Sequence, residues 1–191
     1  MKSVLISIQP KWCELIASGK KTFEVRKTKP KLELPFKCYI YCTHSKNGIA
    51  WCKGNEILNG KVIGEFVCDF IEPYWFMHGD TGIEECEDVQ FACLSAEEII
   101  QYGNGKQLEF WHISNLVIYD KPRDLCEFEK PWYDSNDKWQ DIRPCERGKG
   151  CKYEYFDYSE NNVACGIDYD GENCPYTKIS RPPQSWCYVE V

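Results

Sequence analysis

The stretch Gly19-Lys20-Lys21-Thr22-Phe23-Glu24-Val25-Arg26 gives the clearest structural signal in the chain. From its fourth residue onward, polar and apolar residues alternate, which is typical of a half-buried β-strand. Phe23 and Val25 are expected on one face of this strand, with Glu24 and Arg26 on the other. The strand therefore presents a carboxylate and a guanidinium along one wall. That wall either binds a polar ligand or is a solvated face, and the charge pattern alone favours the solvated face.

The composition indicates a globular protein of one domain with an insertion, or of one domain with a small module. Of the 191 residues, 43% are apolar and 15% aromatic, and the formal net charge is −7. This charge does not match the basic surface that long duplex DNA requires, but it is compatible with a local basic cleft for a nucleoside or a short RNA. No apolar run reaches about 20 residues, the length of a membrane-spanning helix, and the N-terminal segment does not resemble a secretory signal. We therefore expect a cytoplasmic protein with no membrane role.

The segments around the motif predict a mixed α+β domain. Ser95 and Glu98 have the spacing of a helix capping box, and Gly64 inside an apolar segment predicts a bulge or a close backbone approach. The expected strands span 3–9, 22–26, 36–44, 60–71, 110–119 and 186–191, and the expected helices span 10–18 and 95–103. Six strands with two helices favour a small closed β-barrel flanked by helices. Residues 45–59 are expected to form a loop, and residues 72–92 receive no assignment.

Thirteen cysteines are unusual for a chain of this length. In a reducing compartment most of them should be free thiols that pack as small hydrophobic residues. Five lie in apolar segments and fit this interpretation: Cys13, Cys38, Cys42, Cys68 and Cys93.

The remaining cysteines of interest lie in a segment, residues 122–183, that is poor in aliphatic residues. A segment that cannot build its own apolar core needs a staple, and four thiolates can hold a structural zinc ion. The candidates are Cys145, Cys151, Cys165 and Cys174. Their spacing lacks the C-x2-C element typical of zinc sites, so free or lightly oxidised thiols remain an alternative. A disulfide is expected only outside a reducing compartment.

The order strand, Pro-initiated helix, then Gly19-x-Lys21-x-x-Glu24-x-Arg26 resembles the ASCH domain, a member of the PUA-like superfamily. The hallmark of that family is a G-x-K-x-x-E-x-R element in this position, and every specified residue is present. The resemblance covers residues 1–124 and the last strand, 184–191, and it leaves 125–183 as a Cys-rich insertion. It implies a PUA-like barrel with a cleft that binds RNA or a modified nucleoside.

Five residues are candidates for ligand binding in such a cleft. The motif supplies Lys21, Glu24 and Arg26, of which Arg26 can bind a phosphate through two N–H groups and Glu24 can accept from an amine or a ribose hydroxyl. Thr43 lies at the end of a strand, where ligands often bind in small barrels. Trp51 lies in a glycine-flanked loop, where we expect it to be exposed and able to stack on a base.

Two other functions remain open. Some relatives are amidohydrolases that act on an acylated cytidine through a motif lysine, a threonine at the position of Glu24 and a downstream glutamate, for which Glu65 is the candidate here. The same residues, Lys21, Glu24 and Glu65, would serve a ribonuclease. Glu24 is expected to raise the pKa of Lys21 and keep it charged, which favours binding over catalysis, although Glu24 itself remains a candidate general base. Alternatively, the acidic insertion binds a protein partner.

Overall fold

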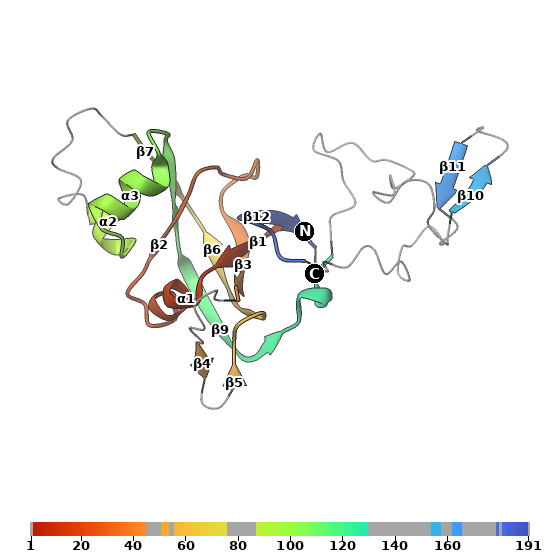
Figure 1. Cartoon of the computed structure of the whole chain (residues 1–191), viewed down its shortest axis with the longest axis horizontal. Helices are drawn as coiled ribbons and strands as arrows, with labels where there is room; N and C mark the ends of the chain where they lie inside the picture. The colour runs from red at the N-terminus through yellow and green to blue at the C-terminus, as the bar shows by residue number, and fades with distance from the viewer. Residues whose placement is uncertain are drawn as a thin grey trace.

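The computed structural model describes residues 2–44, 51–53, 56–75, 87–129, 154–157, 162–165, 179 and 181–190. Within these residues eight strands form a five-stranded and a three-stranded sheet, and three α-helices accompany them (Figure 1). Two further strand pairs, β4 (Cys52–Lys53) with β5 (Glu56–Ile57) and β10 (Glu154–Asp157) with β11 (Asn162–Cys165), are short hairpin ladders. The α+β class is therefore as predicted.

The five-stranded sheet has the order β12-β1-β3-β6-β9. Its strands β1 and β3 are parallel, and all its other neighbours are antiparallel. The last strand of the chain, β12, returns to pair with the first, so that Ser3 lies opposite Val189. The bounds are β1 (Ser3–Ile8), β3 (Phe36–Cys42), β6 (Val62–Cys68), β9 (Ser114–Arg123) and β12 (Trp186–Val189).

The three-stranded sheet has the order β2-β8-β7, with β2 at Phe23–Arg26, β7 at Ile71–Tyr74 and β8 at Leu108–His112. Its strands β7 and β8 continue directly into strands of the larger sheet, because β7 follows β6 after two residues and β9 follows β8 after one. The expected strand 60–71 is therefore two strands, and so is the expected strand 110–119. One bent antiparallel pair thus belongs to both sheets.

The strand ladders do not form the closed barrel that we expected. Among the described residues no ladder joins β2 to the five-stranded sheet. A side chain spans this gap instead, because Arg26 Nη2 donates a hydrogen bond of 2.6 Å to the backbone carbonyl of Ser7 on β1. On this side, a hydrogen bond from a charged side chain therefore links the two sheets in place of backbone pairing.

Helix α1 (Pro10–Ala17) packs on the five-stranded sheet. Pro10 occupies its first turn, where the missing N–H costs no hydrogen bond. Cys13 and Ile16 are fully buried in the apolar cluster of β1, β3 and β6. Gly19 follows the helix with φ of 72°, a conformation that favours glycine.

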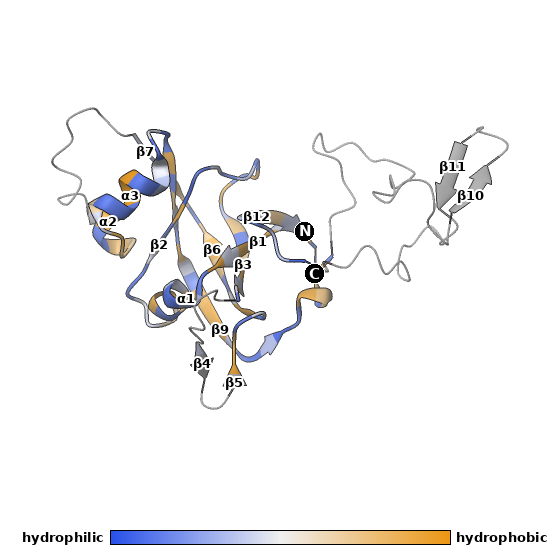
Figure 2. Cartoon of the chain, viewed as in Figure 1, coloured by the Kyte–Doolittle hydropathy of each residue, from blue (hydrophilic) through white to orange (hydrophobic). Residues whose placement is uncertain are grey.

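Helices α2 (Glu87–Phe91) and α3 (Ala96–Gly103) lie together on the side of β2 that faces away from the five-stranded sheet (Figure 1). Ile99 of α3 packs in one cluster with Phe23 and Val25 of β2. The predicted capping box is present, because Ser95 accepts from the Glu98 amide and Glu98 accepts from the Ser95 amide. Figure 2 shows hydrophobic residues concentrated along the strands, whereas the loop between β2 and β3 is largely hydrophilic.

Gly64 lies at the predicted close approach. The register of β6 shifts beside Gly64, and a Cβ atom there would lie 2.3 Å from the carbonyl oxygen of Val117. Any residue with a side chain would push the backbone of β9 away, which explains why a glycine occupies this position.

All five cysteines predicted to be free thiols are free, and four of the five are buried as predicted. Cys13, Cys38, Cys42 and Cys68 are free and buried, whereas Cys93 is free but half-exposed. Of the four candidate zinc ligands, Cys145, Cys151 and Cys174 lie outside the described residues, and only the backbone of Cys165, in β11, is described. No helix in the described part of the chain has the length and apolar character needed to cross a membrane.

Candidate functional site

The charged residues of β2 and the preceding turn are buried, so the solvated-face interpretation is wrong. Lys21, Glu24 and Arg26 are only 2%, 6% and 7% exposed. Alternation along β2 does separate Phe23 and Val25 from Glu24 and Arg26, as predicted. Both faces are covered, however: α2 and α3 cover the apolar face, and Arg26 on the polar face reaches β1.

The three charged side chains form one cluster centred on Glu24. Glu24 Oε1 lies 2.9 Å from Arg26 Nη2, and Glu24 Oε2 lies 3.5 Å from Lys21 Nζ. Two cations against one carboxylate give the ionised cluster a formal charge of +1. Burial of such a cluster removes it from water, so its remaining polar atoms need partners within the protein or from a ligand.

Both cations are also anchored to backbone from distant elements. Lys21 Nζ donates a 2.7 Å hydrogen bond to the carbonyl of Ala92, after α2. Arg26 Nη2 donates to Ser7, and Nη1 lies 3.4 Å from the hydroxyl of Ser185, just before β12. The turn after α1 directs Lys21 toward Glu24, because the Lys21 amide still bonds to the Leu15 carbonyl. This turn explains why strand parity did not predict the direction of Lys21.

Two polar atoms of the cluster have no hydrogen-bond partner among the described residues: Glu24 Oε2 and Arg26 Nε. The only others of this kind in the described part are Glu109 Oε2 and Trp111 Nε1, on the neighbouring strand β8. Each such atom costs about 1–3 kcal/mol when it is buried without a partner. Native proteins retain few of them, so four on two paired strands indicate a site that completes its hydrogen bonds with a ligand or with water.

The environment shifts the pKa of Lys21 downward, against our expectation. Burial of the ammonium lowers the pKa more than the nearby carboxylate of Glu24 raises it. The sequence placed Glu24 next to Lys21 correctly, but it gave no indication that both would be almost fully buried. A lysine with a lowered pKa gives up its proton more readily than an exposed one, which bears on the catalytic alternative.

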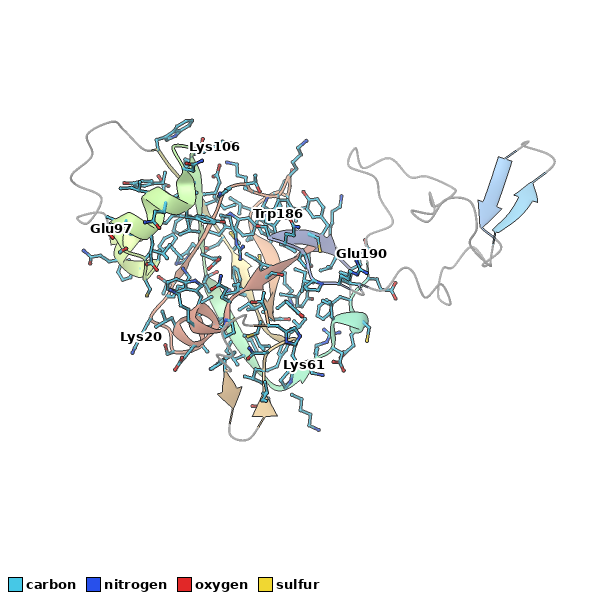
Figure 3. All side chains as sticks on the ribbon, viewed as in Figure 1. Lys20, Lys61, Glu97, Lys106, Trp186 and Glu190 are labelled. Carbon is cyan, nitrogen blue, oxygen red and sulfur yellow. The ribbon has the colours of Figure 1, made fainter. Side chains whose placement is uncertain are left out.

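Aromatic and charged residues from α1 and α3 surround the cluster. The ring of Trp12 lies 3.9 Å from Lys11 Nζ and 5.3 Å from Lys21 Nζ. Lys11 reaches Glu98 at 3.3 Å and so connects α1 to α3. On α3, burial raises the pKa of Tyr102, while the positive charge of Arg26 opposes this shift. Figure 3 draws the described side chains on the ribbon and labels Lys20, just after α1, and Glu97, on α3.

Glu65, the predicted downstream acid, lies elsewhere. It accepts hydrogen bonds from Lys37 at 2.7 Å and from the Tyr119 hydroxyl at 2.6 Å. It is paired across the strands with Tyr39, which packs in the cluster on the opposite face of the five-stranded sheet from α1. The structure therefore does not bring Glu65 together with Lys21 and Glu24.

The other two predicted residues lie near the end of β3. The Thr43 amide donates a 2.8 Å hydrogen bond to the Ile8 carbonyl at the end of β1, and the side chain of Thr43 is half-exposed. Trp51 is half-buried against the main apolar cluster, and not exposed as expected, because its amide and carbonyl bond to Asn59 and Leu58.

Sequence reasoning missed four residues that the fold brings to the cluster: Ala92, Tyr102, Glu109 and Ser185. Only Glu109 carried a signal, since it is a charged residue beside the predicted strand 110–119. Ala92 contributes a backbone carbonyl, which no side-chain pattern reveals. No group of three or more His, Cys, Asp or Glu with metal-binding geometry occurs in the described part of the chain.

This site lies on an α+β fold of two sheets that share a bent strand pair. A family model described as "ASCH domain" matches residues 6–114, which is more than half of the chain. The chain therefore belongs to the ASCH domain family, and the resemblance in its sequence is confirmed.

The solved structures that resemble the chain include the crystal structure of ASCH from Zymomonas mobilis, at 23% identity and a TM-score of 0.48, with 64% of this chain and 73% of that chain covered. A variant of the same protein with one tyrosine replaced gives 22% identity, a TM-score of 0.49 and coverage of 65% and 77%. A comparison with curated proteins finds no match.

Proposed function

We propose that this ASCH domain binds RNA or a nucleoside through Lys21, Glu24 and Arg26. The observation that supports this proposal is the buried charged cluster in which Glu24 Oε2 and Arg26 Nε have no hydrogen-bond partner among the described residues. A ligand that donates to the first atom and accepts from the second satisfies both. The family resemblance implies a ligand of the same class.

The contacts of Arg26 favour the base or the ribose over a phosphate. The terminal nitrogens of Arg26 already contact Glu24, Ser7 and Ser185, so Nε is the guanidinium position without a partner in the described part of the chain. Bidentate phosphate binding needs two parallel N–H donors, and this geometry does not offer them. This corrects the expectation that Arg26 binds a phosphate in a fork. Thr43 and Trp51 remain predicted ligand-binding residues.

Isothermal titration calorimetry with the four nucleosides and short single-stranded RNAs tests this proposal. We expect Glu24→Gln to weaken binding by about tenfold or more, because one charged acceptor is lost. The matched control is Glu72→Gln, which changes an exposed glutamate on β7 of the same sheet. Unchanged affinity in a folded Glu24→Gln protein would contradict the proposal.

A second candidate function is hydrolysis, as an amidohydrolase or a ribonuclease. The observation that favours it is the lowered pKa of Lys21, which burial produces and which a lysine base requires. Glu24 lies 3.5 Å away and is the neighbouring acid–base candidate, whereas Glu65, the acid expected from the sequence, bonds to Lys37 and Tyr119 away from this site. Incubation of the wild type and of Lys21→Met with acylated cytidine and with RNA tests this function. Absence of product at mildly acidic to mildly basic pH rules it out.

We propose further that residues 125–183 form an insertion within a domain made of residues 1–124 and 184–191. A zinc ion held by four of its cysteines, Cys145, Cys151, Cys165 and Cys174, remains a prediction that elemental analysis of the purified protein tests. A protein partner of the acidic insertion is a separate prediction. Deleting 125–183 and comparing the proteins that co-purify before and after the deletion tests that partner.

A further inference from the structure

The four buried polar atoms without a partner lie on one face of the β2–β8 strand pair. Glu24 is paired across the strands with Trp111, and Arg26 is paired with Glu109. Residues two apart on a strand share a face, and so do residues directly opposite in a ladder. Glu24 Oε2, Arg26 Nε, Glu109 Oε2 and Trp111 Nε1 therefore belong to a single block of side chains.

The dimensions of this block match a small planar ligand. Opposite residues of an antiparallel pair are separated by about 5 Å between their Cβ atoms. Alternate residues on a strand are separated by about 7 Å. The four side chains are therefore rooted at the corners of a rectangle whose size is comparable to that of one nucleobase.

The chemistry of the four atoms is mixed. Two are carboxylate oxygens, which accept hydrogen bonds, and two are N–H groups, which donate them. A phosphate has only acceptors at neutral pH, so two of the four atoms would repel it. An exposed edge of a base carries donors and acceptors side by side.

The nearby lysines do not supply the missing hydrogen bonds of the two carboxylate oxygens. Lys29 Nζ lies 3.7 Å from Glu109 Oε2, and Lys21 Nζ lies 3.5 Å from Glu24 Oε2. Both distances exceed the usual range of an N–H···O bond. Lys29 comes from the loop after β2, and its side chain is 53% exposed, whereas that of Glu109 is 10% exposed.

We propose that Glu109 and Trp111 complete the ligand site, and that the site recognises the hydrogen-bonding edge of a nucleobase with an exocyclic amine. This inference rests on the proposed function and adds the substrate class. Guanine, cytosine and adenine each carry an exocyclic amine that donates to a carboxylate, and each offers an acceptor to an N–H group. Uracil offers a single edge N–H, between two carbonyl oxygens, so it leaves one of the two carboxylate oxygens without a donor, and the site discriminates against uridine.

The test is calorimetry with guanosine, cytidine, adenosine and uridine on the full chain. At least one amino-bearing nucleoside is expected to bind about tenfold or more tightly than uridine, and Glu109→Gln to reduce this preference to about threefold or less. A merely structural role for Glu109 would lower all affinities together and leave the preference unchanged. Glu72→Gln, on the exposed side of β7, is expected to keep the wild-type preference.

A second variant keeps the test decisive if Glu109→Gln does not fold. Trp111→Phe removes the indole N–H and keeps an aromatic ring in the apolar cluster. We expect it to weaken binding of the preferred nucleoside by about threefold or more. Circular dichroism before each titration establishes that the variant is folded.

The outcomes separate this inference from the proposed function. Loss of binding in Glu24→Gln, with wild-type affinity and preference in both Glu109→Gln and Trp111→Phe, overturns the inference and leaves the proposed function standing. A nucleoside 5′-monophosphate that binds about a hundredfold more tightly than its nucleoside overturns the neutral-base assignment. If the wild type binds no nucleoside and no RNA, both fail, and buried water completes the four atoms.

Discussion

The two lysine–glutamate pairs Lys37–Glu65 and Lys21–Glu24 differ in how completely their hydrogen bonds are satisfied. Glu65 accepts hydrogen bonds on both oxygens, from Lys37 and from Tyr119, and its pair is partly exposed. Glu24 is almost fully buried, yet Oε2 has no hydrogen-bond partner among the described residues. The difference teaches that charge type alone does not identify a site. A satisfied, partly exposed pair needs no further partner, whereas a buried pair with an oxygen that lacks a hydrogen bond is the better candidate for ligand binding.

The largest predicted effect is that of Glu24→Ala on stability. This change leaves the ammonium of Lys21 and the guanidinium of Arg26 buried without a counter-charge. We expect a loss of about 3–5 kcal/mol in the free energy of unfolding, measured by urea denaturation. A loss no greater than that of an exposed pair would mean that water reaches the cluster.

The second prediction uses the pH dependence of Lys21. Because burial lowers its pKa below the ordinary 10.5, the unfolded chain binds more protons than the folded chain between the two pKa values. Stability supplied by this group therefore rises with pH inside that window, by up to about 1.4 kcal/mol for each pH unit.

Lys21→Met lacks this titration and is the reference. Urea unfolding of both proteins between about pH 6 and about pH 10 measures the difference. We expect the wild type to gain stability relative to Lys21→Met as the pH rises toward 10.5. A difference that stays constant or falls over this range contradicts the lowered pKa.

The third prediction concerns α3, which brings Tyr102 to Arg26. Ser95→Ala removes the side-chain acceptor of the capping box and is expected to cost about 1 kcal/mol. The thermal midpoint of unfolding measures this loss. Because α3 carries Tyr102 beside Arg26, nucleoside affinity is expected to fall together with the stability of the helix. An equally stable variant would show that packing of Ile99 and not the cap holds the helix.

The smallest predicted effect is that of Glu65→Gln. Glu65 and Lys37 are 24% and 44% exposed, so we expect a loss below about 1 kcal/mol at neutral pH. Burial opposes ionisation of Glu65, but the bonds from Lys37 and Tyr119 hold its pKa below the ordinary 4.5. This stabilisation is therefore present above that value and lost as the pH falls through the folded-state pKa. Urea unfolding at neutral and acidic pH measures it, and a loss as large as that of Glu24→Ala contradicts the comparison.

The sequence was sufficient for features that local chemistry decides. Pro10 and Gly19 bounded the first helix, the spacing of Ser95 and Glu98 predicted the capping box, and Gly64 predicted a close approach of strands. The motif also placed Glu24 and Arg26 on one face of β2. Each of these features depends on residues within a few positions of one another.

Features that depend on packing between distant parts of the chain could not be predicted from the sequence. The burial of Glu24 follows from helices and strands that cover β2 on both faces, which the alternation of β2 itself cannot show. Glu65 was chosen as the second acid from its strand, but strand pairing places Glu109 opposite Arg26. Arg26 closes the gap to β1 with its side chain, and this replaced the expected backbone closure of the barrel.

Nuclear magnetic resonance of the side-chain N–H groups tests the central claim most directly. Arg26 Nε–H and Trp111 Nε1–H are buried donors without a partner among the described residues, and Trp111→Phe identifies the indole signal. The account predicts that both signals shift when a binding nucleoside is added, whereas the indole of Trp75, which is 66% exposed just after β7, does not. If a nucleoside saturates the protein and both buried signals stay in place, the ligand binds elsewhere and the account is wrong.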